Sequence, residues 1–176
     1  MKELLEAIEH DSLVRMKALL EAGLDLSQPI IIGEEYELEE PDETGLLFYA
    51  IRTHASLEAI ELLLKYGVDI HKLDDDKISA LDTAIKFKRK DIVQLCIDNG
   101  MDLNSTKRRS GILPLLLAAC FSDTEMVDLL LKNGADLHTT DTSGMGAKDY
   151  AKKLGQKKMV AFLEAKGAKH NLYPNE

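Results

Sequence analysis

The chain has 176 residues, of which 45% are hydrophobic and 30% are charged, and its formal net charge at pH 7 is −9. This length and composition are typical of one folded domain with a hydrophobic core, and they exclude a disordered chain. Two cysteines, Cys96 and Cys120, are too few for a disulfide framework, and no apolar run reaches the ~20 residues of a membrane-spanning helix. We therefore expect a cytoplasmic protein in a reducing compartment.

A leucine-rich stretch that ends in glycine recurs five times along the chain, and a second series of alanines precedes it. The glycines are Gly23, Gly67, Gly100, Gly134 and Gly167, with spacings of 44, 33, 34 and 33 residues. The alanines are Ala7, Ala50, Ala84, Ala118 and Ala151, each 16 or 17 residues before its glycine. This pattern predicts a first helix whose alanine permits close packing and a second, amphipathic helix that ends at a left-handed glycine. One such pair cannot cover its own apolar face, so we expect the units to stack.

This helix pair, closed by the motif Gly-Ala-Asp-Leu at residues 134–137, resembles the ankyrin repeat. The resemblance implies an all-α solenoid of stacked helix pairs with short β-hairpin loops, and the glycine–aspartate turn argues against the alternative of tetratricopeptide or HEAT-like pairs. We expect a single domain over residues 1–176, complete as an array, with polar residues capping both ends. The expected repeats are 1–27, 28–71 with an insertion at 29–43, 72–104, 105–138 and 139–171, followed by a polar tail at 172–176. The Thr-Pro-Leu-His opening of the family is eroded here, and only Pro114 remains as a helix-starting proline.

The insertion at 29–43, which we name the acidic finger, is the largest departure from the repeat. Ile30 to Ile32 and Tyr36 to Leu38 are β-prone runs about a possible turn at Gly33-Glu34, which predicts a hairpin. Its seven carboxylates are Glu34, Glu35, Glu37, Glu39, Glu40, Asp42 and Glu43. We interpret it as a probe for a basic surface, with Tyr36 and Leu38 as anchors. The alternative is a solvated insertion that only packs its isoleucines.

Charge is unevenly distributed along the chain. Residues 1–50 carry 3 basic and 13 acidic side chains, whereas residues 151–176 carry 6 basic and 2 acidic ones. An acidic first part should repel nucleic acid and anionic membrane and favour a basic partner, unless the charge serves solubility alone.

The family resemblance also implies where a partner would bind, since ankyrin arrays use their concave side, formed by loop tips and exposed faces of the first helices. Phe87 and Phe121 lie one repeat apart, and with Ile78 and Ile112 they are expected to form an exposed apolar patch. The alternative is that both rings turn inward between repeats. The expected partner-binding residues are Tyr36, Leu38, Arg52, Asp75, Ile78, Lys86, Phe87, Arg109, Ile112 and Phe121.

Catalytic and metal motifs are not evident in the sequence. His71 and His138 hold equivalent positions two repeats apart, about 20 Å, which is too far to share one ion, and we expect them to cap turns. Cys96 takes a core leucine position, and Cys120 has no neighbouring base. The run Asp74-Asp75-Asp76 lacks the spacing of a calcium loop, and Lys107-Arg108-Arg109 is too short for a nucleic-acid footprint.

These observations predict a monomeric, non-enzymatic protein, without cofactor or metal, that binds another protein through its concave face and the acidic finger. A sharper hypothesis makes it an inhibitor or immunity-type protein for a basic enzyme. The alternative is a scaffold or assembly factor in a larger complex.

Overall fold

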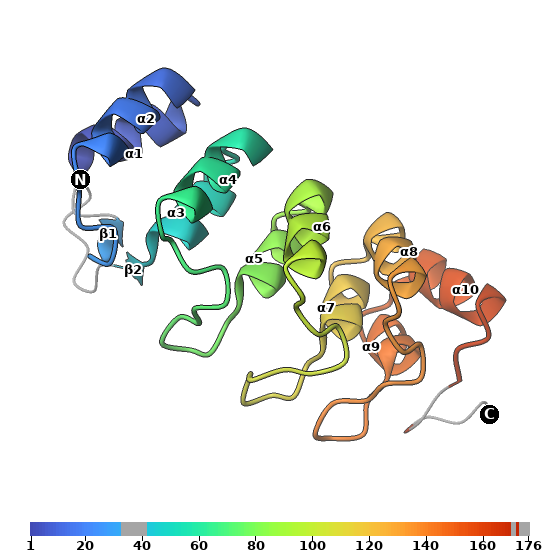
Figure 1. Cartoon of the computed structure of the whole chain (residues 1–176). Helices are drawn as coiled ribbons and strands as arrows, with labels where there is room; N and C mark the ends of the chain where they lie inside the picture. The colour runs from blue at the N-terminus through green and yellow to red at the C-terminus, as the bar shows by residue number, and fades with distance from the viewer. Residues whose placement is uncertain (33–41, 170–171, 173–176) are drawn as a thin grey trace. The chain divides into compact units, whose positions relative to one another are not determined.

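The computed structural model describes residues 1–32, 42–169 and 172 (Figure 1). Within these residues the chain forms ten helices in five consecutive pairs and one two-stranded antiparallel sheet. The helices are α1 (Lys2–Glu9), α2 (Leu13–Glu21), α3 (Leu46–Arg52), α4 (Leu57–Lys65), α5 (Ala80–Lys86), α6 (Lys90–Asp98), α7 (Pro114–Cys120), α8 (Thr124–Lys132), α9 (Ala147–Lys153) and α10 (Lys157–Ala165). The strands are β1 (Ile30–Ile32) and β2 (Asp42–Thr44). The predicted all-α fold of repeated helix pairs is confirmed.

The chain divides into two compact units, Met1–Asp74 and Asp75–Glu176. The boundary falls close to the start of the predicted repeat at 72–104. In the first unit α2 packs against α4, and in the second unit α7 packs against both α5 and α9. Figure 1 shows the short first helix and the longer second helix of a pair side by side.

The five alanine positions of the sequence pattern lie in the first helices and are at most 1% exposed. The carbonyl of each alanine also accepts a hydrogen bond from the backbone N–H five residues later, at 2.8 to 3.2 Å. This bond closes the turn into the second helix, so each alanine both permits close packing and anchors the bend of its repeat.

The second helix of each pair ends as the sequence predicts. All five repeat glycines have positive φ, between 80° and 98°, which is the conformation that glycine adopts without a steric penalty. The aspartate two residues later explains the rest of the motif. The carboxylates of Asp25, Asp69, Asp102 and Asp136 each accept the backbone N–H two residues further on, at 2.8 to 3.0 Å. This local bond fixes the turn that leads to the next repeat.

The two ends of the acidic finger pair with each other as antiparallel strands, but the pairing differs from the expected one. Ile30 pairs with Thr44 and Ile32 with Asp42, so the strand that closes the hairpin is β2 rather than residues 36–38. Ile30 is buried, and this strand end is thereby fixed to the body of the first unit. Tyr36 and Leu38 lie outside the described residues.

Candidate partner-binding surface

The ends of the first helices in the second unit carry one apolar residue each. Phe87, Phe121 and Leu154 directly follow α5, α7 and α9, where each residue caps the C-terminus of its helix. Their backbone N–H groups bond back into the last turn, at 2.9 to 3.2 Å, which fixes where the side chains leave the helix. We name these three residues the apolar row.

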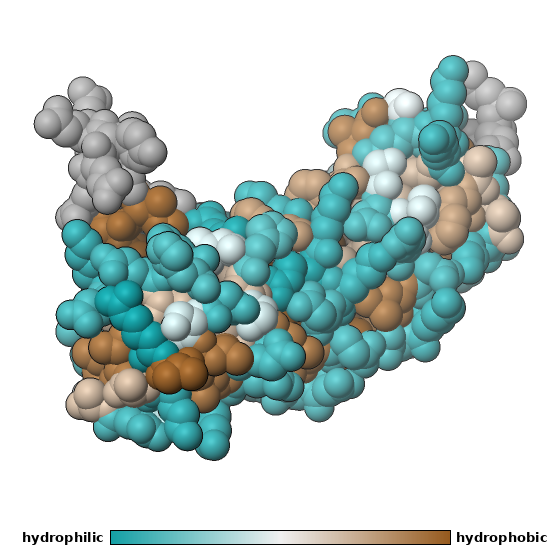
Figure 2. All heavy atoms as spheres, turned by 90° about the horizontal axis from the view of Figure 1, so that it is seen from above, coloured by the Kyte–Doolittle hydropathy of each residue, from teal (hydrophilic) through white to brown (hydrophobic). Residues whose placement is uncertain are grey.

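The members of the apolar row are not part of the buried core. Phe121 is 38% exposed and Leu154 is 52% exposed, while Phe87 is half-buried. The Nζ of Lys86 lies 5.8 Å from the centre of the Phe87 ring, within range of a cation–π interaction. Figure 2 shows the wider setting, in which apolar residues form separate areas on a largely hydrophilic visible surface.

Bonds between repeats place the members of the row beside one another. The Nε2 of Gln156 donates to the carbonyl of Cys120 at 2.7 Å, which holds the turn after Leu154 against the end of α7. The side chains of Lys90 and Glu125 are paired between the starts of α6 and α8, just beyond the other two row positions. Packed helices are about 8–10 Å apart, so successive row members are separated by roughly that distance.

Ile78 and Ile112 are half-buried and do not lie at this end of the repeats. Ile78 precedes the N-terminus of α5 and Phe87 follows its C-terminus. Seven helical residues span about 10 Å, so the two residues lie at opposite ends of the helix. The structure therefore divides the expected patch into a row at the helix C-termini and two isoleucines at the N-termini.

The charged residues that the sequence singled out in the second unit are mostly exposed. Asp75 and Arg109 are exposed in loops, and Lys86 is exposed at the end of α5. Arg108, in contrast, turns inward, and its Nη1 lies 3.6 Å from Oδ1 of the buried Asp82. The basic run at 107–109 is thus partly structural.

The acidic side chains on the first helices of the second unit are buried and used internally. Asp82 accepts the hydroxyl and the backbone N–H of Ser79 in a capping box, at 2.9 and 3.0 Å. Asp149 accepts the N–H of Gly146 at 2.8 Å. The exposed charged residues of these helices are Lys86, Lys152 and Lys153.

The first unit is strongly acidic, in contrast to the second unit. It contains 6 basic and 17 acidic residues, whereas the second unit contains 16 basic and 14 acidic ones. Arg52 is half-buried at the end of α3. The boundary between the compact units is therefore also the boundary between a strongly acidic and a nearly neutral part of the chain.

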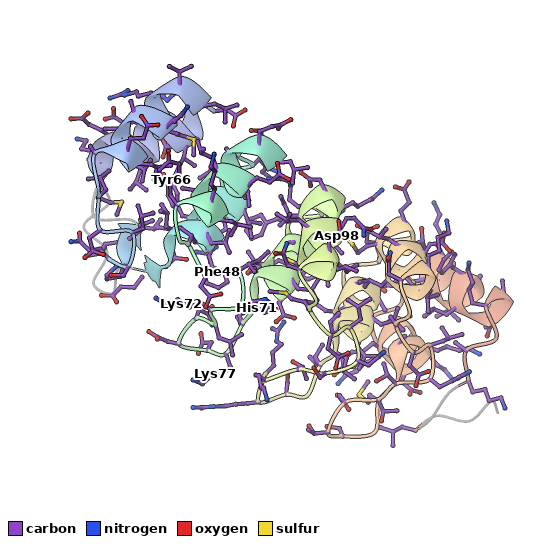
Figure 3. All side chains as sticks on the ribbon, in the orientation of Figure 1. Phe48, Tyr66, His71, Lys72, Lys77 and Asp98 are labelled. Atoms are coloured by element: carbon purple, nitrogen blue, oxygen red, sulfur yellow. The ribbon has the colours of Figure 1, made fainter. Side chains whose placement is uncertain are left out.

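A pocket of about 420 Å³ lies within the first unit, between the turn after α2, the start of α3 and the turn after α4. Its wall includes Phe48, Tyr66 and Lys72, which come from these segments (Figure 3). The Asp25 carboxylate in this wall accepts hydrogen bonds from the hydroxyl and the backbone N–H of Ser27, at 2.6 and 3.0 Å. These two bonds lower the pKa of Asp25. The pocket combines apolar side chains with exposed turn backbone.

The cysteines have the environments that the sequence indicated. Cys96 is fully buried, and Cys120 is half-buried at the end of α7. Burial raises the pKa of the Cys96 thiol to about 12 and that of the Cys120 thiol to about 11. Both groups are therefore protonated at neutral pH, the unreactive form of a thiol.

His71 and His138 take part in the turns through their backbone, because the N–H of each donates to the preceding turn aspartate at 2.9 Å. Among the residues that the structure describes, no cluster of histidine, cysteine and acidic side chains is arranged to hold a metal ion. Within the same part of the chain, none of the helices has the length and apolar character needed to cross a bilayer.

Leu154 is a surface residue that was left out of the expected partner-binding residues. It occupies the same repeat position as Phe87 and Phe121, three residues after the buried alanine of its helix. The periodicity of the repeat places it with the other two residues.

Comparison with known proteins agrees with this architecture. The family model described as ankyrin repeats (3 copies) matches residues 4–107 and 88–173, nearly the whole chain. An L-asparaginase of Dirofilaria immitis is 29% identical over 157 residues, which cover 89% of this chain and 25% of that protein. A putative ankyrin repeat-containing protein of Treponema pallidum (strain Nichols) is 27% identical over 170 residues, 82% of this chain and 56% of that protein. The chain thus spans between a quarter and somewhat over half the length of these two relatives.

Proposed function

The chain belongs to the ankyrin-repeat family, and from this we propose that it is a non-enzymatic module that binds a partner protein through the apolar row. Ankyrin repeats are a protein–protein interaction module. The observation that carries the proposal is the exposure of Phe121 and Leu154 at equivalent positions of successive repeats. Apolar side chains in register on a rigid support offer contact area at little entropic cost.

The acidic first unit supports a second contact, with a basic region of the partner. A net charge of −11 on the first unit attracts basic surfaces and speeds their association. Tyr36 and Leu38 of the acidic finger, and Arg52 at the end of α3, are the proposed contact residues of the first unit. With both contacts made, the protein would act as an inhibitor that occludes a basic enzyme. We propose that it does so as a monomer and that it binds neither nucleic acid nor membrane.

A scaffold or assembly factor is the second candidate function. Exposed apolar residues outside the second unit favour it, because Leu13 and Val14 at the start of α2 are 38% and 84% exposed. A scaffold would use its separate surface areas for different proteins, whereas an inhibitor would use them for one enzyme.

Affinity capture from the native cell lysate, followed by quantitative mass spectrometry, tests the proposal. The intact chain is compared with a variant in which the glutamates of the acidic finger at 34, 35, 37, 39 and 40 are changed to glutamine. This variant keeps the residues of β1 and β2, so the strand pairing at the two ends of the finger is preserved. A double variant, Phe121→Ala with Leu154→Ala, examines the apolar row.

One basic protein captured by the intact chain and reduced in both variants is the expected result for an inhibitor. Several proteins, each dependent on a different area, would support the scaffold. Capture that is the same for all three chains would contradict the proposed surfaces.

A further inference from the structure

The apolar row is bordered by lysines. Lys86, Lys152 and Lys153 are exposed at the ends of α5 and α9, and Lys88 is exposed in the turn after Phe87. Among the described residues, none of these four lysines forms an ion pair. Their positive charge is therefore available to a ligand on the row.

The acidic residues on the other side of the row, in the first turns of α6 and α8, are already engaged. Asp91 receives two hydrogen bonds from the guanidinium of Arg89, at 2.7 and 3.0 Å. Glu125 is paired with Lys90. The carboxylate of Asp123 caps α8 by accepting a backbone N–H at 3.0 Å. Asp91 and Glu125 are each neutralised by a basic partner, while Asp123 keeps its charge, so with the four lysines the surroundings of the row are net basic.

We propose that the apolar row binds an acidic, extended peptide segment of the partner, with apolar side chains at every third position. This inference rests on the proposed function and adds the chemistry of the bound segment. A polyproline II segment has three residues per turn and rises about 3.1 Å per residue, so every third side chain recurs on one face after roughly 9 Å. That repeat matches the spacing of about 8–10 Å between neighbouring helices, and hence between row members. The carboxylates between the apolar positions would face the four lysines.

An acidic peptide is favoured over the other polyanion that could combine with aromatic and basic residues, a single-stranded RNA. RNA binding requires an extended basic track with stacking platforms. The chain carries a net charge of −9, and four lysines border a row that includes the aliphatic Leu154. An acidic peptide needs only local charge complementarity together with apolar contact.

Panning a phage-displayed library of random 14-residue peptides against the intact 176-residue chain tests this inference. Selected peptides are then synthesised, and their Kd values are measured for the intact chain and for the charge-reversed double variant Lys86→Glu with Lys153→Glu. A second double variant, Lys107→Glu with Lys169→Glu, is the control, because these exposed lysines lie in the loop between α6 and α7 and after the C-terminus of α10, away from the row. A 20-nucleotide single-stranded RNA is titrated in parallel.

The expected peptides carry net negative charge and apolar residues three positions apart. Their affinity should fall roughly tenfold or more for the row variant and little for the control, and the loss should shrink at high salt. Peptides with lysine in place of their acidic residues should prefer the row variant. The inference would be overturned if the selected peptides were neutral or basic, or if no peptides were selected. It would also be overturned if both variants lowered the affinity equally, or if the RNA bound more tightly than the peptides. Loss of partner capture in the Phe121→Ala and Leu154→Ala variant, with non-acidic peptides selected, would leave the proposed function standing and remove only this inference.

Discussion

The side chain of Asn104 is hydrogen-bonded to the backbone of Asp136, one repeat further along the chain, with 2.8 Å between Asn104 Oδ1 and the Asp136 nitrogen. Its Nδ2 also donates to the carbonyl of Gly134, at 3.0 Å. One amide thus joins two consecutive turns of the second unit. We expect Asn104→Ala to lower the free energy of unfolding by about 1–2 kcal/mol, because two hydrogen bonds between repeats are lost. Urea denaturation measures this change, with Asn99→Ala as the control, because the Asn99 amide donates only to the carbonyl of Leu95 in its own helix.

One of the two matching positions in the first unit is Ser27, four residues after its repeat glycine, as Asn104 is four after Gly100. Ser27 bonds to its own turn, at Asp25, and lines the pocket together with Gly67 and Asp69. Ser27→Asn should therefore stabilise the chain, by about 0.5–1 kcal/mol, by reaching the backbone of Gly67 and Asp69 as Asn104 reaches its neighbours. A rise in the urea midpoint without a change in slope would agree. An unchanged or lower midpoint would show that the pocket geometry does not permit the bridge.

The turn between the two helices of a pair contains a left-handed residue. Ser122 has a φ of 55° and Gly155, at the same position one repeat later, has a φ of 67°. Ser122→Gly should raise the free energy of unfolding by several tenths to about 1 kcal/mol, because glycine adopts this conformation without strain. Gly155→Ala should lower it by a similar amount, for a conformational reason alone, since an added Cβ would have no atom within 4 Å. Opposite shifts of the melting temperature are the expected result, and shifts of the same sign would contradict it.

The thiol of Cys120 should react slowly although it is partly accessible. Burial holds its pKa at about 11, whereas an unfolded cysteine has a pKa near 8.5. The thiolate is the charged form that burial disfavours, so its fraction at pH 8 is about one in a thousand in the folded chain. We expect iodoacetamide to alkylate Cys120 about a hundredfold more slowly at pH 8 than in the urea-unfolded chain.

The folded-state rate at Cys120 should rise about tenfold for each pH unit between 8 and 10, while the rate of the unfolded chain levels off. Peptide mapping by mass spectrometry reads each cysteine separately. Equal rates in the folded and unfolded chains at pH 8 would contradict the buried position.

The repeat geometry could be predicted from the sequence because it depends on residues with a strict local requirement. Position 118 is fully buried and takes alanine because a larger side chain would push neighbouring helices apart. Position 134 has positive φ and takes glycine because other residues are strained there. Both requirements recur with every repeat and are therefore visible as periodicity.

Pairings between distant residues could not be read in the same way. The partner of Ile30 is Thr44, although residues 36–38 have higher β propensity, because the register depends on where the chain re-enters the next repeat. Likewise, Lys148 appears in the sequence as an ordinary helix-surface lysine. It is 4% exposed and lies 2.7 Å from a carboxylate oxygen of Glu164, a contact between the two helices of the last pair.

The apolar patch was only partly predicted for a related reason. Phe87 and Phe121 were found from their equivalent repeat positions, and Leu154 follows from the same rule. Whether Ile78 belongs with them depended on the exact ends of α5, which periodicity does not define.

Binding through the apolar row is tested most directly by the affinity of the captured partner for the chain, measured by titration calorimetry. Phe121→Ala with Leu154→Ala is compared with Leu13→Ala with Val14→Ala, which removes two exposed apolar side chains from the first unit. If the partner binds through the apolar row, the row variant loses about 2 kcal/mol or more of binding free energy, roughly thirtyfold in Kd, with an unchanged melting temperature. The first-unit variant should bind as the intact chain does. Equal affinities for all three chains, or a loss confined to the first-unit variant, would contradict binding through the apolar row.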